Sequence, residues 1–161
     1  MTVEDYNKAV DQYADGVYRF ILKNVRDEEN ARDIVQDSFE KLWMHLNDVS
    51  AEKAKSYLFR SAYNRMIDII RKGKRQGAYE ERHEEEHAHE EQYSDVGEIL
   101  NKAVQFLPED QRAVLMLRDY EGYSYKEIAE ITKLTEPQVK VYIYRARVFL
   151  KNYIGKIDVL V

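Results

Sequence analysis

The sequence predicts an all-α protein made of two small helical domains joined by an acidic linker. Apolar residues recur every three or four positions over long stretches, as in amphipathic helices, and no stretch alternates apolar and polar residues as a strand does. Two prolines and six glycines in 161 residues leave few positions that would interrupt a helix. Residues 77–97 hold one arginine against eight acidic residues, and this run separates residues 1–76 from residues 98–161.

Residues 1–76 are expected to form an N-terminal helical bundle from segments at residues 3–24, 29–46, 51–55 and 56–72. The three- and four-residue spacing predicts which side chains face the core of this bundle. In the first segment the inward residues include Val17 and Ile21. In the second segment the predicted buried stripe is Val35, Phe39, Leu42, Trp43 and Leu46. The last segment is expected to bury Leu58, Ala62, Met66 and Ile69, together with the stem of Arg65.

The outward face of the 56–72 segment has a composition that suits DNA. Six basic residues and one acidic residue lie between positions 60 and 75. Arg60, Asn64 and Arg71 align on this face, with Tyr63 and Ile67 beside them. Basic residues interleaved with aromatic ones favour phosphate contact and base stacking, and the alternative is an ordinary solvated face of a bundle helix.

Two short helices in the C-terminal part each begin with a capping box. Ser124 lies three residues before Glu127, and Thr135 lies three residues before Gln138. In each pair the hydroxyl can accept from a backbone N–H while the longer side chain reaches back to the N-cap amide. The predicted helices cover residues 125–131 and the stretch that begins at residue 136, and together they form a C-terminal helix-turn-helix domain.

The second of these helices has one apolar and one basic face. Its apolar stripe is Val139, Ile143, Ala146 and Leu150. Its opposite face carries Gln138, Lys140, Val141, Tyr144, Arg145, Arg147 and Lys151. Residues 138–156 contain five basic residues and no acidic one. This layout is typical of a recognition helix that enters a DNA major groove, and the alternative is a helical hairpin with a polar outer face.

Composition excludes several classes of protein. The chain has no cysteine, so it can form neither a disulfide nor a thiolate metal site. The N-terminus lacks the basic and apolar regions of a signal peptide, and no apolar run approaches the roughly 20 residues that span a bilayer. We therefore expect a cytoplasmic protein without membrane insertion, cofactor or catalytic residues.

One motif in the linker has a catalytic alternative. His83-Glu84-Glu85-Glu86-His87 matches the H-E-x-x-H pattern of zinc hydrolases. That chemistry needs a helix anchored in a core, with an apolar face that holds both histidines. Every neighbour here is charged or small, so the sequence favours a solvated acidic linker without a metal site.

Three stretches in series carry a family resemblance. They are Asp33-Ile34-Val35-Gln36-Asp37-Ser38-Phe39 with Leu42-Trp43, Tyr57-Leu58-Phe59-Arg60 with Ala62, Asn64, Asp68 and Arg71, and Leu107-Pro108-Glu109-Asp110-Gln111-Arg112. In this order they resemble the polymerase-binding segment, the promoter-melting helix and the opening of the C-terminal domain in the extracytoplasmic-function (ECF) sigma factors of bacteria. The resemblance implies a transcription initiation factor with a region 2-like domain at 1–76 and a region 4-like domain at 98–161.

The resemblance also implies partners and site residues. The partners are core RNA polymerase, promoter DNA and an anti-sigma factor. Core polymerase would be contacted by Asp33, Gln36, Asp37 and Phe39. The −10 promoter element would be contacted by Tyr57, Arg60, Asn64, Asp68, Arg71 and Lys72. The −35 element would be contacted by Gln138, Lys140, Val141, Tyr144, Arg145 and Arg147.

Two differences between this chain and the usual family pattern bear on the assignment, and one alternative function stays open. Members of the family usually place glycine where this chain has Lys133, so a left-handed backbone there would be strained. They often carry Ser-Arg where this chain has Val141-Tyr142, which bears on phosphate contact. A plain helix-turn-helix regulator is the alternative function, although it would need neither the helix at residues 33–43 nor the basic face of residues 60–72.

Overall fold

The structure is a computed structural model that describes residues 1–75 and 95–160. Most of the predicted linker, including His83-Glu84-Glu85-Glu86-His87, lies outside these residues. The described residues contain helices and no strand, which confirms the predicted all-α class. Within the same residues, no helix combines the length and the apolar character needed to cross a membrane.

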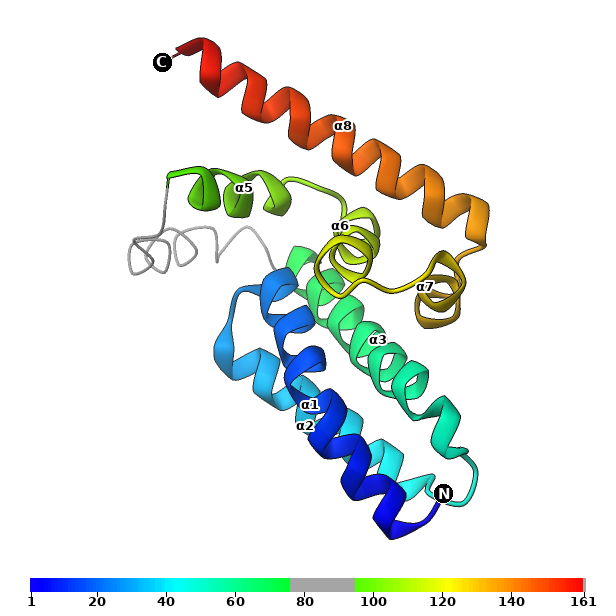
Figure 1. Ribbon diagram of the computed structural model, residues 1–161. Helices are drawn as coiled ribbons and strands as arrows, with labels where there is room; N and C mark the ends of the chain where they lie inside the picture. The colour runs from blue at the N-terminus through cyan, green and yellow to red at the C-terminus, as the bar shows by residue number, and fades with distance from the viewer. Residues whose placement is uncertain (76–94, 161) are drawn as a thin grey trace.

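The N-terminal half is a bundle of α1 (Val3–Val25), α2 (Glu28–Met44) and α3 (Ala54–Arg75), with a short 3-10 turn η1 (Ala51–Lys53) before α3 (Figure 1). Local chemistry explains where the helices start. Thr2 forms a capping box with Asp5 at the start of α1, and the Asp27 side chain accepts from the backbone N–H of Asn30 at the start of α2. The bundle buries Val17, Phe20, Ile21, Ile34, Leu42, Leu58 and Met66.

The buried face of α2 differs from the predicted one. Its buried residues are Ala31, Ile34, Ser38, Phe39 and Leu42. Trp43 is 50% exposed, so the prediction that it points inward was wrong. Ser38 belongs to the buried face instead, because its hydroxyl donates to the carbonyl of Ile34 at 2.8 Å and no polar group is left unsatisfied. The prediction used apolar residues alone, so it placed the buried stripe of α2 one residue further round the helix.

The C-terminal half consists of α5 (Asp95–Gln105), α6 (Glu109–Leu115), a π-helical turn η2 (Met116–Tyr120), α7 (Tyr125–Thr132) and α8 (Glu136–Leu160). Helix α8 packs on α5, α6 and α7, on the side of this half away from α1 and α2 (Figure 1). Its buried residues Val139, Ile143 and Ala146 belong to the predicted stripe, and the fourth residue of that stripe, Leu150, is half-buried. Helix α5 begins at Asp95, so the last three residues of the predicted linker are helical.

The two halves pack against each other, and α3 has a separate apolar stripe for each contact. Leu58, Ala62 and Met66 form one stripe at four-residue spacing, and Phe59, Tyr63 and Ile67 form a second stripe one residue further on. Helix α7 packs on α3, and the Phe59 ring meets the Tyr123 ring edge-on, with centroids 5.2 Å apart.

The second stripe corrects the predicted orientation of α3. Tyr63 and Ile67 were expected outward but are buried, because α6 and α7 of the C-terminal half pack on α3. Thr132 and Leu134 lie across a hollow from them. Ile69 is half-buried, and the Arg65 side chain is 44% exposed and pairs with Asp37 at the surface.

Polar contacts also join the halves. The buried Arg112 of α6 donates through Nε to the Asn24 side-chain oxygen at 3.3 Å, and Asn24 is itself buried at the end of α1. Gln105 Nε2 donates to the backbone carbonyl of Lys23 at 3.2 Å. These bonds satisfy polar groups that would otherwise be buried without partners, so they favour one docking geometry.

Candidate nucleic-acid interface

The start of α8 is fixed by a capping box. The backbone N–H of Thr135 donates to Gln138 Oε1 at 2.9 Å, and the backbone N–H of Gln138 donates to Thr135 Oγ1 at 3.3 Å. Ser124 and Glu127 form the equivalent pair at the start of α7. Both predicted capping boxes are therefore confirmed. Because the Gln138 carbonyl oxygen is used in the cap, its side-chain N–H groups are what it can offer to a base edge.

The outward face of α8 exposes a row of side chains suited to a major groove. Val141 is 42% exposed and Tyr144 is 69% exposed, and Arg145 lies beside them on the exposed side. Lys140 is exposed as well, and its Nζ lies 5.4 Å from the centre of the Tyr125 ring. The Arg118 guanidinium lies 4.5 Å from the same ring, so one tyrosine holds a cation from η2 and a cation from α8.

Arg147 differs from the other basic residues of α8. Its guanidinium donates to both carboxylate oxygens of Asp119 in η2. These hydrogen bonds raise the pKa of Arg147 above its ordinary value. The pair turns Arg147 toward η2, so its structural partner is a carboxylate of the same domain.

The predicted −10 residues lie along α3. Asn64, Asp68 and Arg71 are exposed and line a hollow of about 450 Å³, with Asp110, Thr132 and Leu134 on its other side. Lys72 is exposed, whereas Arg60 is half-buried. In the same hollow, burial raises the pKa of the Tyr63 phenol to about 12.

Tyr57 lies at the start of α3, away from this hollow. It is half-buried, and its hydroxyl donates to the carbonyl of Lys41 at 3.5 Å, with His45 Nδ1 3.4 Å away. Tyr57 thus connects α3 to the end of α2.

The predicted polymerase-binding residues lie on α2. Asp33 and Gln36 are exposed, and Gln36 Nε2 donates to Glu40 Oε1 at 3.4 Å. Asp37 pairs with Arg65 Nε at 3.6 Å. Phe39 is only 8% exposed and packs edge-on against the Tyr6 ring at 6.3 Å between centroids. Its side chain is therefore part of the bundle core, where it supports α2.

Two exposed apolar residues near the end of α2 were not among the predicted site residues. Trp43 is 50% exposed and rests edge-on against Tyr6, with ring centroids 5.0 Å apart, and Met44 is 77% exposed. A signal was available for Met44, which lies outside the predicted buried stripe, whereas Trp43 follows the buried Phe39 by four residues and was therefore predicted inward. Two large apolar side chains that are adjacent and exposed can contribute area to a contact with another macromolecule.

The part of the chain that the structure describes contains no group of three or more His, Cys, Asp or Glu residues arranged to hold a metal ion.

Comparisons with known proteins agree with this geometry. Residues 9–76 match the family model "Sigma-70 region 2", and residues 97–150 match the model "Sigma-70, region 4". The RNA polymerase sigma factor SigV of Bacillus subtilis is 30% identical over 144 residues, which cover 88% of this chain and 86% of that protein. The ECF RNA polymerase sigma factor SigM of the same bacterium is 29% identical, over 94% of each protein.

A solved structure has the same fold. It is the co-crystal structure of the sigma factor RpoE in complex with the anti-sigma factor NepR from Bartonella quintana, with a TM-score of 0.76 and 23% identity. The likeness covers 95% of this chain and 98% of that one, so it extends over both helical halves. These sequence and family-model matches show that the chain belongs to the RNA polymerase sigma factors, in the ECF class, and is a transcription initiation factor.

Proposed function

We propose that this sigma factor binds core RNA polymerase through the exposed face of α2, reads the −35 element with α8 and opens the −10 element with α3. Residues 1–76 would act as the region 2 domain and residues 98–161 as the region 4 domain. The observation that carries the proposal is the presence of two separate polar and basic helix faces in one chain, in the order of the two matched family models.

The proposal that α8 reads the −35 element rests on its row of outward side chains. Arg145 can donate two parallel hydrogen bonds to a guanine edge, and Val141 can touch a thymine methyl group. Lys140, held against Tyr125, suits a phosphate contact that fixes the helix in the groove. Tyr144 and the free N–H groups of Gln138 complete this face, whereas Arg147 is left out because it is bonded to Asp119.

The proposal that α3 opens the −10 element rests on Asn64, Asp68 and Arg71. An unstacked base needs hydrogen-bond partners for its edge, and an amide beside a carboxylate offers both donors and acceptors. Arg71 and Lys72 offer positive charge to the adjacent phosphates, with Arg60 further along the helix. Tyr57 is proposed as a support for the start of α3, through its contact with α2.

Polymerase binding rests on α2. Asp33, Gln36 and Asp37 present a polar and acidic row that suits a basic partner surface. Trp43 and Met44 add apolar area, and buried aromatic side chains contribute much of the affinity in protein interfaces. Phe39 is proposed to act from the core, by holding α2 in place.

The partners follow from the same reasoning. The structural relative is bound to an anti-sigma factor in its crystal, and we propose that an anti-sigma factor regulates this chain as well. The protein would work in the cytoplasm, where bacterial polymerase meets DNA, and would contribute binding energy rather than a reaction of its own.

The test is transcription from templates with randomised −35 and −10 segments. Purified core polymerase with this protein should enrich one pair of motifs at fixed spacing, whereas core polymerase alone should enrich none. Asn64→Ala should weaken selection in the −10 segment and Arg145→Ala in the −35 segment. A complex that initiates without sequence preference, or enrichment of the same motifs by the isolated C-terminal half, would contradict the proposal.

A further inference from the structure

The outward face of α8 carries an apolar stripe as well as its polar side chains. The residues of this outer stripe, Val141, Tyr144 and Val148, are all exposed. They follow one another at spacings of three and four residues, so they share one side of the helix. The opposite side carries the buried residues Val139 and Ile143. Helix α8 therefore has two apolar stripes, of which the outer one is open at the surface of the described structure.

Amide and basic side chains border the outer stripe on both sides. A helical turn of about 3.6 residues places Gln138 and Arg145 along one edge of the stripe, and Lys140 and Lys151 along the other. All four residues are exposed. An apolar strip between two polar and basic edges fits a DNA major groove, because base edges lie at the floor of the groove and phosphates lie along its two rims.

One of the two edges is held in place by an aromatic ring. Lys140 Nζ lies 5.4 Å from the centre of the Tyr125 ring, and the Arg118 guanidinium lies 4.5 Å from the same centre. Arg118 is fixed further because its Nη1 donates to the backbone carbonyl of Tyr123 at 2.9 Å. Two cations from two elements therefore lie on this side of the stripe, where they can meet DNA phosphates and hold α8 in one orientation.

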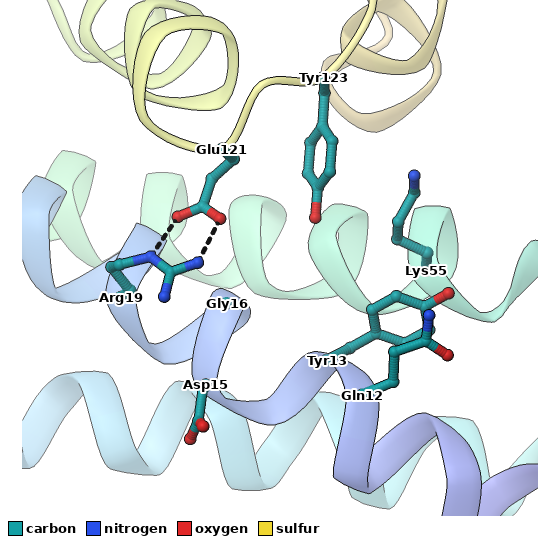
Figure 2. A pocket seen from close by; sticks show the side chains of 8 residues that line it. All are labelled: Gln12, Tyr13, Asp15, Gly16, Arg19, Lys55, Glu121 and Tyr123. Carbon is teal, nitrogen blue, oxygen red and sulfur yellow. Dashed lines mark hydrogen bonds and ion pairs between the residues drawn. The ribbon is translucent and has the colours of Figure 1, made fainter.

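Four carboxylates of the C-terminal half are each paired with a basic residue. The pairs are Asp119–Arg147, Glu121–Arg19, Glu127–Lys55 and Glu130–Lys53. Glu121, for example, reaches down from the loop after η2 to Arg19 of α1, and its two oxygens accept from Arg19 Nε and Nη2 at 2.7 Å each (Figure 2). Residues 138–156 of α8 contain five basic residues and no acidic one. Positive charge therefore predominates beside the outer stripe, which favours a polyanion as its partner.

We propose that the outer stripe selects the −35 element through the methyl groups of thymine. The proposal rests on the assignment of α8 to the −35 element and names the base chemistry that α8 selects there. The thymine methyl group is the apolar feature that base pairs present in the major groove, so it can cover Val141 and the Tyr144 ring. These two residues lie near the N-terminal end of α8, the part of a recognition helix that reaches base edges. They are about 4.5 Å apart along the helix axis, close to the rise of about 3.4 Å per base pair, so they meet neighbouring base pairs.

Deoxyuridine tests this proposal, because it pairs with adenine as thymidine does and lacks only the methyl group. Promoter binding by the holoenzyme would be measured on the −35 segment that the randomised templates enrich, with each thymine replaced in turn by uracil. Replacements at two neighbouring base pairs should each weaken binding by about fourfold, the factor expected for the burial of one methyl group. A replacement in the spacer between the two promoter elements should have no effect.

Protein variants connect each methyl group to one side chain. In Val141→Ala one of the two uracil effects should be lost, and in Tyr144→Ala the other should be lost. Tyr144→Phe keeps the ring and should retain both effects, so it separates the ring from the hydroxyl group. Arg145→Ala is the matched control from the same face of α8. It should weaken binding to the thymine and uracil templates by the same factor, so the ratio between them should stay as in the wild type.

Three results would overturn the proposal. They are an enriched −35 segment without thymines at neighbouring base pairs, unchanged binding after every uracil replacement, and uracil effects that persist in Val141→Ala and Tyr144→Ala. A loss of holoenzyme assembly in Val141→Ala, with equal binding of the thymine and uracil templates, would assign the stripe to a protein contact instead.

Promoter selection separates this proposal from the proposed function. If the holoenzyme enriches a −35 motif and uracil has no effect on binding, the reading of methyl groups is refuted and the assignment of α8 stands. If no −35 motif is enriched, the proposed function itself fails.

Discussion

Among the described residues, two that are not glycine adopt a left-handed backbone, and both follow a helix end. Arg26 has φ 55° after α1, and Lys133 has φ 61° after α7. Lys133 still donates its N–H to the carbonyl of Ala129, so the turn of the helix-turn-helix is formed at the cost of backbone strain. The strain expected from the sequence at Lys133 is therefore present.

Lys133→Gly should raise the free energy of unfolding by about 1 kcal/mol, because glycine adopts this conformation without the Cβ clash. Urea unfolding followed by circular dichroism measures the change. Gly122→Ala is the reverse control: Gly122 has φ 73° and no atom near its Cβ position, so the loss there reports backbone strain alone. A lower stability of Lys133→Gly would show that the lysine side chain contributes more than its strain costs.

Tyrosines at the contact between the halves predict a loss of stability at high pH. Burial raises the pKa of Tyr63 and of Tyr123 to about 12. A phenol whose pKa is higher in the folded than in the unfolded state stabilises the folded protein. This contribution is complete at pH values below the pKa of the unfolded state, near 10, and is lost as the pH rises toward 12. Unfolding free energy should therefore fall less steeply between these pH values in Tyr63→Phe than in the wild type. Identical slopes would contradict the burial of this phenol, and Tyr144→Phe serves as the exposed control.

Two arginines two positions apart on α8 should respond differently to removal. Arg145→Ala should weaken promoter binding by the holoenzyme by about 1–3 kcal/mol, with relaxed choice at one base pair of the −35 element. Arg147→Ala removes the bonds to Asp119, so it should lower the unfolding free energy by up to about 1 kcal/mol and leave base choice unchanged. Binding to a panel of single-base promoter variants, beside urea unfolding, distinguishes the two. Altered base choice in Arg147→Ala would place this residue on the DNA face.

At the scale of elements, helices with both a cap and an amphipathic stripe were predictable from the sequence. Helices α7 and α8 follow from their capping boxes and from Ile128, Val139 and Ile143. The face of α2 was predicted only in part: Phe39 and Leu42 are buried as expected, whereas the buried Ser38 carries no apolar signal and Trp43 is exposed. Helices α5 and α6 were not placed as elements, and only the stretch at residues 107–112 pointed to this part of the chain.

The exposed row of α2 gives a prediction about polymerase. Asp33→Lys with Asp37→Lys should lower stability by no more than about 1 kcal/mol, since the Asp37–Arg65 pair is exposed at the surface. The same double variant should lose affinity for core polymerase through charge repulsion. Gel filtration of the variant with core enzyme measures assembly, and Glu4→Lys with Asp11→Lys on α1 is the charge-matched control. Unchanged assembly of the double variant would show that this row of α2 is only solvated.

At the scale of the whole molecule, the packing of the two halves against each other could not be predicted from the sequence. Residues 19 and 121 are 102 positions apart, and neither lies in a local pattern that indicates a partner. Tyr63 was assigned to the outward face because its own domain leaves it uncovered, and the C-terminal half supplies the cover. Periodicity reports which residues share a helix face but not which element covers that face. The sequence therefore predicted the separate helix faces of the candidate site, but it did not predict how these faces are arranged in space.

Site-specific cross-linking tests directly the proposed assignment of α3 to the −10 element and of α8 to the −35 element. Because the chain has no cysteine, Arg65→Cys and Tyr144→Cys each offer one attachment point for a photoactivated cross-linker, beside Asn64 on α3 or on the outward face of α8. In the holoenzyme–promoter complex, the label at position 65 should react with the −10 segment, and the label at position 144 should react with the −35 segment. Both labels reacting with the same segment, or no DNA adduct from position 65, would contradict the account.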